Sequence, residues 1–571
     1  MLNLNSINVR VTSVIAVALL SIAAVSTTDW IKGIRNKPFI DVREYGADPT
    51  GVTSSTTACN NAATAAGAGG TIVFPAGTYL MTDACAPVLS KVAGVYRKTR
   101  VIGAGIDSTR IMVSASFNMS AIGVFDCHQT VLYTEGCEIS GLSILYIQPD
   151  SASIGSYTHW PPAINLNGSA WSIVRDVRIY DAWDGISMLG TFVSYSYFPD
   201  ASAITLDGVQ VTAYHKAILQ DGSWDTIRIH NMHCQASFNA IDASPTTIVN
   251  KTAVYYANAT CLSLGHGDDI KISDSLLGGK VAIDGEPGAI SGGPSTEIDN
   301  TWFDGGAVLL WNADRPLKVT NCDFEGGTPY TDQVLATRGQ VQISNSRFSG
   351  GSTTASFVHY HPNADLFPDP SLTLDGNVFT QTGGVSGSPP LVFIDADAGS
   401  NAAVVVGHNI LRFLTASGAA VFSNAVLTIN LNSAAWINAI VENNVFQGDV
   451  NTRSWLSINR AGPPLVVTGN ITNGLAITLP SASWAGVEVL IAGNPGYNPV
   501  GPATQSTGGS PWGYTAGPTP EILYLSGAAT LSVVKRGVTV CTAVPCSIWL
   551  SPGDNVVSTY TGTLVAAKDI Q

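Results

Sequence analysis

The sequence predicts an all-β protein in which a parallel β-solenoid follows a short helical cap and precedes a small antiparallel β-domain. The main observation is a repeat that begins near residue 270. In it, aliphatic or β-branched residues alternate before a small polar residue, an aromatic or aliphatic residue and glycine. The anchors Phe303, Phe324 and Phe348 are 21 and 24 residues apart. A period in the twenties with strand-like alternation is typical of a solenoid whose coils bury their apolar faces by stacking.

Asparagine recurs at one position of this repeat, at Asn300, Asn321 and Asn345. Stacked coils would bring these amides to one corner, where an amide can both donate and accept hydrogen bonds along the solenoid axis. We therefore predict a structural polar ladder there and not a binding site.

Residues 1–26 have the pattern of a secretory signal peptide. Arg10 is their only charge, residues 11–25 are apolar or small, and small residues precede Ser26. This apolar run is shorter than the roughly 20 residues that a membrane-spanning helix needs. The alternative is an uncleaved hydrophobic anchor, or a helix that attaches the chain to a virion.

Residues 27–80 are predicted to form the N-terminal cap and the entry to the solenoid. The stretch 53–66 is rich in alanine, as a helix would be, and Ser54 or Ser55 could cap that helix. A cap is expected because the end coil of a solenoid otherwise exposes unpaired strand edges.

The solenoid is predicted to cover residues 81–495, and the chain changes character after it. Residues 496–571 begin with a linker rich in glycine, proline and serine. Short alternating segments follow at close spacing, which predicts a small antiparallel β-domain.

The composition excludes two classes of protein. The chain has 571 residues with a net charge of −14, and only 12% of the residues are charged while 45% are hydrophobic. Disordered chains combine high net charge with few apolar residues, so this one is predicted to fold. The acidic balance also disfavours nucleic acid as a partner, because phosphate binding needs clustered Lys and Arg.

The chain has nine cysteines, an odd number that leaves at least one unpaired. Cys541 and Cys546 lie close enough in sequence to bridge a hairpin, and Cys127 and Cys137 could do likewise. Cys322 lies inside the repeat and is predicted to be a small buried residue. Four metal ligands at zinc-like spacing are missing from the sequence, so we predict no metal site.

The segment Asp41–Gly51, with its sequence DVREYGADPTG, precedes the segment Gly69–Tyr79, with its sequence GGTIVFPAGTY. Together they closely resemble the entry motif of pectate-lyase-like right-handed β-helix proteins, a superfamily that includes polygalacturonase-related enzymes and phage tailspike depolymerases. The resemblance implies a right-handed parallel β-helix over residues 38–495. It departs from the family at residues 54–56, where acidic residues are usual. The motif is specific for the fold and not for a reaction.

The C-terminal segment from Asn494 to Tyr560 resembles a β-module that occurs on such β-helix proteins. That module is common in phage and prophage tail proteins. The resemblance favours a tail protein, whereas the signal-like residues 1–26 favour export.

One candidate for chemistry is the run GHGDDIK at residues 265–271. It resembles the polygalacturonase motifs, but compresses onto one coil what that family spreads over several. The resemblance extends at most to His266, as a residue near the sugar, and to Asp268 and Asp269. We also predict that Lys271 binds substrate. Two carboxylates beside a histidine and a lysine could perform general acid–base catalysis. The alternative is a glycine-rich turn that leads into a strand, with Asp capping the turn.

A second candidate comes from the repeat itself, because Asp304 and Glu325 each follow a phenylalanine anchor on consecutive coils. Neighbouring strands lie about 4.8 Å apart. Two carboxylates at about that distance suit a retaining glycosidase. Trp302 and Asp323 precede the same anchors and are predicted to bind substrate. The alternative is that these acids are only polar turn residues.

Two further tryptophans complete the predicted substrate site. Trp311 could offer a flat face to a sugar ring, and Trp160 lies in a predicted loop rich in aromatic residues and histidine.

A lyase would instead need a Lys or Arg base and usually Ca²⁺ held by several carboxylates. No cluster with that spacing is present in the sequence, so we expect no cofactor, and Ca²⁺ only if the protein is a lyase.

These observations predict a protein that is secreted or carried on a virion tail, and that binds and cleaves a polysaccharide. We favour a glycoside hydrolase over a polysaccharide lyase. The alternative is a non-catalytic receptor-binding tail protein or a cell-surface adhesin. Tailspike-like solenoids are often trimers, so a homotrimer attached to a virion or cell surface is one expected assembly.

Overall fold

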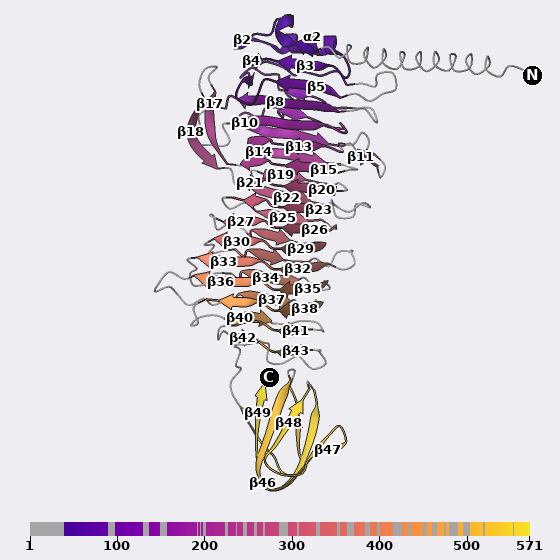
Figure 1. Ribbon diagram of the computed structural model, residues 1–571, viewed down its shortest axis with the longest axis vertical. Coiled ribbons are helices and arrows are strands. Elements are labelled where there is room, and N and C mark those ends of the chain that lie inside the picture. Colours follow the sequence, from indigo (N-terminus) through magenta and orange to yellow (C-terminus); the bar gives the residue numbers. More distant parts are fainter. Residues whose placement is uncertain are drawn as a thin grey trace, which may run out of the picture.

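The computed structural model describes residues 39–570 with short gaps. It leaves out residues 90–97, 130–135, 149–156, 191, 194–195, 198–200, 202, 223–225, 236, 244–247, 256–259, 266–268, 285–294, 305–307, 314, 327–331, 351–354, 363–369, 383–388, 397–399, 415–424, 432–435, 449–453, 459–464, 473–475, 479–488, 495–502, 518–519 and 552. Parallel strands stack coil upon coil below an N-terminal cap, and an antiparallel module follows the last coil (Figure 1). The prediction of an all-β, right-handed parallel β-helix is confirmed. The predicted signal or anchor segment 1–26 lies outside the described residues.

Successive coils contribute strands to three parallel ladders, which we call the first, second and third ladder. The first ladder contains β1 (Phe39–Asp41), β3 (Thr71–Phe74), β5 (Thr99–Gly103), β8 (Cys137–Tyr146), β10 (Ile173–Leu189), β13 (Thr205–Asp207), β15 (Ile227–His230), β20 (Asp269–Ser273), β23 (Ser295–Asp299), β26 (Leu317–Thr320), β29 (Gln340–Ser344), β32 (Ser371–Asp375), β35 (Asn401–Gly407), β38 (Trp436–Glu442), β41 (Leu465–Thr468) and β43 (Val489–Ala492).

The second and third ladders share the long strands of the early coils, because β10 runs through the turns and pairs in all three ladders. The second ladder contains β2 (Thr50–Ser54), β4 (Gly77–Met81), β6 (Thr109–Val113), β8, β10, β14 (Gln210–Asp221), β16 (His233–Gln235), β21 (Leu276–Gly278), β24 (Trp302–Phe303), β27 (Asp323–Gly326), β30 (Arg347–Gly350), β33 (Val378–Thr382), β36 (Ile410–Leu414) and β39 (Val445–Gln447). The third contains β7 (Phe125–Asp126), β9 (Ile164–Asn165), β10, β14, β19 (Thr260–Leu264), β22 (Lys280–Asp284), β25 (Leu309–Asn312), β28 (Val334–Ala336), β31 (Val358–Tyr360), β34 (Val392–Ala396), β37 (Leu427–Leu431), β40 (Ser454–Ile458) and β42 (Ala476–Thr478).

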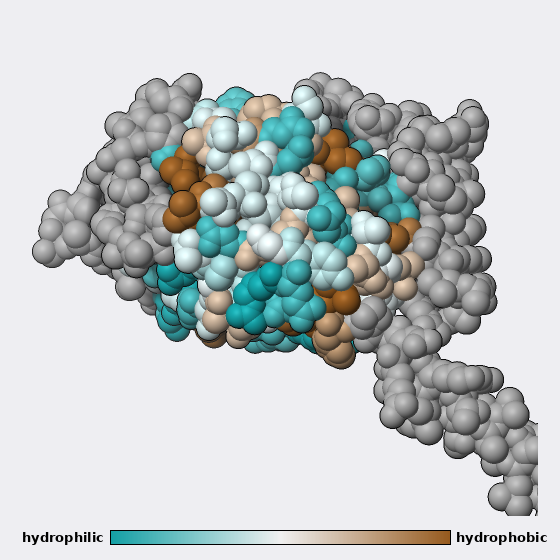
Figure 2. All heavy atoms as spheres, turned by 90° about the horizontal axis from the view of Figure 1, so that it is seen from above, coloured by the Kyte–Doolittle hydropathy of each residue, from teal (hydrophilic) through white to brown (hydrophobic). Residues whose placement is uncertain are grey.

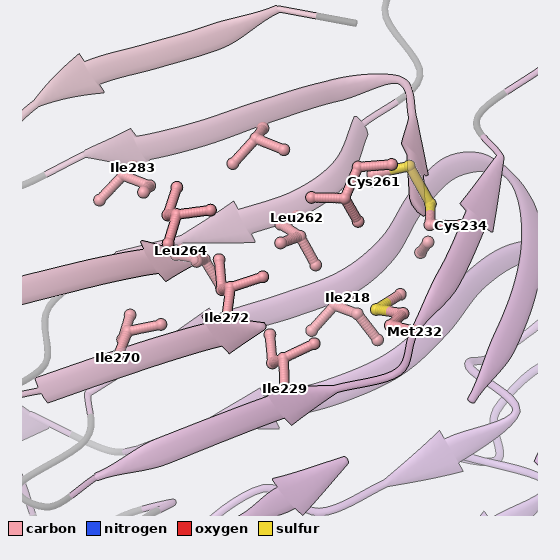
Figure 3. Packing of buried hydrophobic residues seen from close by; sticks show 14 of the residues in the cluster. Ile218, Ile229, Met232, Cys234, Cys261, Leu262, Leu264, Ile270, Ile272 and Ile283 are labelled. Atoms are coloured by element: carbon pink, nitrogen blue, oxygen red, sulfur yellow. A yellow bond between two sulfur atoms is a disulfide. The ribbon is translucent and has the colours of Figure 1, made fainter. Parts of the chain in front are cut away.

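The core runs along the inside of the helix because alternate side chains of every strand point inward. Figure 3 shows aliphatic side chains from consecutive coils packed against one another beside the bridge between Cys234 and Cys261. The predicted anchors stack as a column of rings with centroid separations of 4.2 and 4.5 Å, and Phe379 extends the column by a further 4.8 Å. The repeat period therefore places the same inward position on each coil, as predicted.

The turn between the first and second ladders holds the predicted asparagines, each in the left-handed region. The φ angles of Asn300, Asn321 and Asn345 are 46°, 54° and 51°. Asparagine tolerates this conformation better than most residues. The side-chain amide of Asn300 donates to Asp274 of the preceding coil at 2.6 Å, and that of Asn321 donates to Asp299 at 3.0 Å. These residues do not bond to one another, so the predicted amide ladder is not at this position.

A continuous amide ladder does occur one residue further along this turn, in the later coils. Its five members are buried, and each of the first four donates a side-chain hydrogen bond of 2.9–3.0 Å to the amide oxygen of the next. They are Asn377, Asn409, Asn444, Asn470 and Asn494. The prediction of a structural polar ladder is therefore right in kind and wrong in its residues.

Helix α2 (Thr56–Ala66) covers the core at the N-terminal end, after the short 3₁₀ helix η1 (Val42–Tyr45). Small buried residues of α2, such as Ala62 and Ala63, pack against the first coil. Ser55 occupies the N-cap position, but its hydroxyl accepts from the backbone of Asp48 and caps no helix amide. Seen from above, this end is mostly polar, with hydrophobic residues in separate spots (Figure 2).

The predicted C-terminal β-domain is confirmed as a six-stranded antiparallel sheet with its own core. The long strands β46 (Glu521–Lys535) and β49 (Asn555–Ile570) pair along most of their length. The other strands are β44 (Ala503–Gln505), β45 (Trp512–Thr515), β47 (Val538–Cys541) and β48 (Cys546–Leu550). Two small hairpins also leave the helix, formed by β11 (Phe192–Val193) with β12 (Ser196–Tyr197) and by β17 (Ser237–Ala243) with β18 (Ile248–Tyr255).

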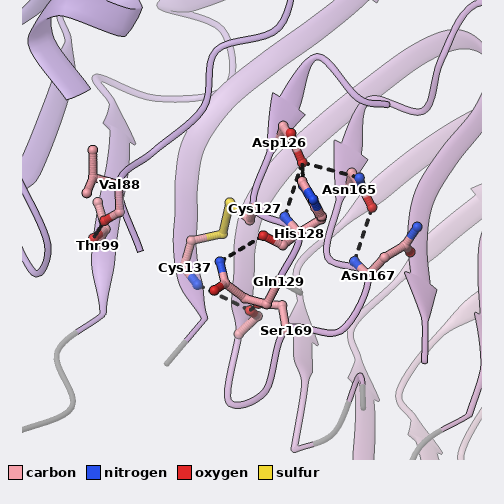
Figure 4. Close-up of a disulfide and its surroundings, with 11 residues drawn as sticks. Val88, Thr99, Asp126, Cys127, His128, Gln129, Cys137, Asn165, Asn167 and Ser169 are labelled. Carbon is pink, nitrogen blue, oxygen red and sulfur yellow. Dashed lines mark hydrogen bonds and ion pairs between the residues drawn. A yellow bond between two sulfur atoms is a disulfide. The ribbon is translucent and has the colours of Figure 1, made fainter. Parts of the chain in front are cut away.

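Eight of the nine cysteines pair. The two predicted bridges are present, between Cys127 and Cys137 (Figure 4) and between Cys541 and Cys546. Two more bridges, Cys59–Cys85 and Cys234–Cys261, join residues 26 and 27 positions apart. Cys322 is free and buried, as predicted. None of the described helices is long and apolar enough to cross a membrane.

Candidate functional site

The carboxylates Asp304 and Glu325 lie on the outer side of the second ladder. Phe303 pairs with Phe324 and both rings are fully buried, so the residues on either side of each ring face outward. Asp304 and Glu325 therefore occupy equivalent positions on adjacent coils, one strand spacing of about 4.8 Å apart along the helix. This is the placement that the repeat predicts.

Trp302 and Asp323 form a second outward pair beside these acids. They are register partners, and Trp302 remains 42% exposed. Arg347 of the following coil binds Asp323, with one nitrogen 2.9 Å from a carboxylate oxygen, and this contact raises the pKa of the arginine. Asp323 therefore balances a cation, while Trp302 leaves an aromatic face open to solvent.

Trp302 stands at one end of a groove with a volume of about 460 Å³. One wall is the column of left-handed turn residues Asp176, Gly208, Asn231, Asp274 and Asn300. The opposite side consists of outward residues of the second ladder, which are register neighbours on successive coils: Gln210, His233, Leu276 and Trp302. The groove thus follows the helix axis, the direction in which an extended polymer chain would lie.

The groove is lined by the carboxylates Asp176 and Asp274 and by His233, whereas Asp304 and Glu325 are not among its lining residues. Burial lowers the pKa of His233, while the negative charge of Asp304 acts in the opposite direction. His233 is therefore neutral near neutral pH and can accept a proton. On the turn side, Asp274 accepts from Asn300 at 2.6 Å and lies 3.3 Å from His230. His230 also contacts Asp207 at 2.9 Å, and both carboxylates raise its pKa.

Two of the tryptophans predicted to bind substrate are in the wrong place for that role. Trp311 is fully buried and Trp160 is 3% exposed, and both belong to the hydrophobic core of the helix. Trp311 points inward from the third ladder, and Trp160 packs against Tyr146 with ring centroids 5.9 Å apart. Neither ring can stack on a sugar at the surface, so these two predictions are wrong.

The described residues of the GHGDDIK run do not line the groove. Asp269 and Lys271 lie on the first ladder, on the other side of the turn, and Lys271 is within 4.0 Å of both Asp269 and Glu297. Together they line a separate hollow. His266 and Asp268 lie outside the described residues. The structure therefore separates Asp269 and Lys271 from the pair Asp304 and Glu325.

Sequence reasoning missed a cluster of histidines and aspartates on the third ladder. His359 lies between two carboxylates, with Nδ1 2.8 Å from Asp332 and Nε2 2.9 Å from Asp395. His361 places its Nδ1 2.7 Å from the same oxygen of Asp395. The sequence does hold a signal, because a His-Tyr-His triplet in a strand turns both imidazoles to one face.

The charges of this cluster depend on one another. Burial alone would lower the pKa of His359, but the hydrogen bonds that it donates to Asp332 and Asp395 outweigh this effect and raise the pKa to about 9. Burial would raise the pKa of Asp395, whereas its bonds with His359 and His361 lower it. His359 is therefore a cation at neutral pH and donates from both ring nitrogens.

Residues 39–188 match a family model described as rhamnogalacturonase A/epimerase, pectate lyase-like. With the stacked parallel ladders, this match confirms the resemblance to the pectate-lyase-like β-helix superfamily. No curated protein matches the chain.

Three solved structures of low identity are similar to the chain. The mannuronan C-5 epimerase AlgE6 A-module of Azotobacter vinelandii is 13% identical, with a TM-score of 0.38 over 76% of this chain and 99% of that one. A mutant tailspike protein of E. coli bacteriophage HK620, in complex with a hexasaccharide, is 12% identical with a TM-score of 0.49, covering 95% and 94%. The Pseudomonas phage phi297 tailspike gp61 is 10% identical with a TM-score of 0.41, covering 93% and 99%.

Proposed function

We propose that the protein binds a polysaccharide along the outer side of the second ladder and hydrolyses it with Asp304 and Glu325. The observation that carries this proposal is Trp302, whose exposed ring lies at the end of the groove and beside both carboxylates. Sugar rings stack well on such a face, because an aromatic side chain buries a large flat area. The match of residues 39–188 to a rhamnogalacturonase/epimerase-type model also favours a carbohydrate ligand.

The positions of the two acids favour a retaining hydrolase. Retaining glycosidases hold their carboxyl groups about 5–5.5 Å apart, whereas inverting enzymes need more room for a water. Adjacent coils supply about the shorter distance. One carboxyl group would donate a proton to the leaving oxygen while the other attacks the sugar. Arg347 is bound to Asp323 and stays protonated, so it is unsuited to act as the base of a lyase.

We further propose that the chain works outside the cell, either secreted or on a virion tail. Four disulfides among the described residues support this, because such bonds persist in oxidising compartments. The second candidate function is a receptor-binding tail protein or adhesin without catalysis, which the same groove could serve.

A homotrimer is the assembly we propose for a tail protein, and sedimentation of the purified chain would test it.

The test is mass spectrometry of products after incubation with a panel of bacterial and plant polysaccharides. Hydrolysis adds one water to each cleaved bond. Asp304→Asn and Glu325→Gln should each lower turnover by at least about 100-fold, as expected for loss of an acid–base catalyst. Asp269→Asn, on the first ladder, is the matched control and should stay active.

Three results would contradict this assignment. Products one water lighter would identify a lyase. Full activity of both Asp304→Asn and Glu325→Gln would move the active site elsewhere. Retention on a glycan without any product would favour the binding protein.

A further inference from the structure

We propose that His359, His361 and Asp395 form a binding site for a divalent transition-metal ion, with Zn²⁺ as the expected ion. This site is separate from the groove on the second ladder and does not depend on the function proposed for it. Among the described residues, these three form the one group of three or more His, Cys, Asp or Glu side chains whose possible ligand atoms all lie within 4.8 Å of one another.

The three side chains converge because of the register of the third ladder. Tyr360 pairs with Ile394, so His361 and Asp395 are neighbours on adjacent coils, and both point to the outer side. His359 is two residues before His361 and therefore shares its face. One oxygen of Asp395 thus lies 2.9 Å from Nε2 of His359 and 2.7 Å from Nδ1 of His361.

These separations are close to those of a metal site. Zn²⁺ lies about 2.0–2.2 Å from nitrogen and carboxylate oxygen ligands, so tetrahedral ligand atoms are roughly 3.3 Å apart. The observed separations of 2.7 and 2.9 Å are a few tenths of an ångström shorter. Small rotations of the two imidazoles would admit the ion, because both rings are partly exposed.

Asp332 supplies the support that a metal-binding histidine usually has. It contacts Nδ1 of His359 at 2.8 Å, so Nδ1 can keep its proton for Asp332 while Nε2 releases its proton when the ion binds. Its other oxygen accepts from the backbone amide of Ser356 at 2.6 Å, so the carboxylate is itself held in place. A ligating histidine commonly donates its second nitrogen to such a carboxylate, which fixes the ring and its tautomer. Phe393 limits the movement of His359 from another side, with ring centroids 4.9 Å apart.

The ligand set selects the type of ion. Two imidazoles and one carboxylate suit Zn²⁺ and its neighbours among the transition metals. Ca²⁺ and Mg²⁺ prefer oxygen ligands only. Three protein ligands would leave a fourth position of a tetrahedral ion for water or for a group of a bound molecule.

The test uses the full-length chain without a histidine tag, because a tag would bind the same ions. Zn²⁺ is titrated in competition with a chromogenic chelator of known affinity. One tight site is expected in the unaltered protein, with affinity at least about 10-fold lower in His361→Ala and in Asp395→Ala. An excess of Ca²⁺ should not displace the Zn²⁺.

The matched control is His230→Ala. His230 also lies between two aspartates, Asp207 and Asp274, but no second histidine accompanies it among the residues of that cluster. This variant should bind Zn²⁺ as tightly as the unaltered protein. Circular dichroism confirms that each variant is folded before its affinity is compared. Binding that His361→Ala and Asp395→Ala leave unchanged, or that His230→Ala abolishes, would overturn the proposal, as would the absence of binding.

Discussion

The turn between the first and second ladders differs between the early and the late coils. In the early coils its left-handed residues, such as Asp274 and Asn300, line the groove. The next residue there is a hydroxyl side chain, as at Ser275 and Thr301, and it bonds to a carbonyl two residues back in its own coil. In the late coils the next residue is an asparagine that bonds to the next coil, as Asn409 does.

The turn between the first and second ladders therefore has a different role in the early coils than in the late coils. The late coils are tied together by buried amides, each of which donates to both a carbonyl and the next amide. The early coils have no amide side chain at Met232, Ser275 and Thr301; the Ser275 hydroxyl donates to a carbonyl of its own coil and accepts from the backbone amide of Met232 in the preceding coil. Carboxylates and histidines lie outside this position. We infer that the late turn holds the coils in register, whereas the early turn supplies the polar wall of a binding surface.

The largest expected loss of stability follows from removing one asparagine side chain of the amide ladder. Asn409→Ala removes the acceptor of the backbone and side-chain amides of Asn377 and a donor to the carbonyls of Leu374 and Gly407. Each buried group left unsatisfied costs about 1–3 kcal/mol. We expect the free energy of unfolding to fall by about 3–5 kcal/mol. The measurement is the shift of the denaturant midpoint.

Asn438→Ala is the control, because it makes the same chemical change at an exposed position of β38. Its effect should stay within about 0.5 kcal/mol. If both variants lose the same stability, the ladder does not hold the late coils together and the comparison fails. Sugar binding in the early groove should persist in Asn409→Ala wherever the protein remains folded.

A smaller effect is expected in the early turn. Thr301→Val keeps the shape of a side chain that is 1% exposed, and removes a hydroxyl that donates to Asp299 at 3.0 Å. Only one local hydrogen bond is lost, so the expected cost is about 1 kcal/mol. The same denaturant assay measures it. If Thr301→Val lowers the free energy of unfolding as much as Asn409→Ala does, the early turn also stabilises the stacking of neighbouring coils.

Much of the fold was readable from the sequence because repetition fixes what each coil must bury. The spacing of Phe303, Phe324 and Phe348 was enough to place one inward column and, beside it, the outward pair Asp304 and Glu325. The amide ladder was predicted one position too early in the turn and on earlier coils than those that form it, because Asn at a left-handed turn and Asn just after it look alike in one sequence. Only backbone geometry separates the two positions.

The site was less predictable, since residue type alone does not say which way a ring points. Trp311 and Trp302 have the same chemistry, but one faces the core and the other the solvent. The cluster of His359, His361 and Asp395 joins residues on two coils across an irregular spacing. Coil lengths in that region vary, so the register between β31 and β34 could not be read from a period.

The smallest expected effect concerns the charge on the wall of the early groove. Asp207 and, more weakly, Asp274 raise the pKa of His230 above its unfolded value of about 6.5. A raised pKa in the folded state means that the protonated form stabilises the fold. That stability is complete below about pH 6.5 and is lost as the pH rises through the folded pKa. Because His230 is half exposed, solvent screening keeps the effect small.

An NMR titration of the histidine ring signals should therefore give His230 a midpoint above about 6.5. The signal is assigned by its absence in His230→Gln. The difference in melting temperature between the unaltered protein and this variant should shrink as the pH rises from about 6 to about 8. A midpoint at or below 6.5 would mean that Asp207 and Asp274 do not act on the histidine. The charged side chains at the early turn would then not distinguish it from the late turn in the way that we infer.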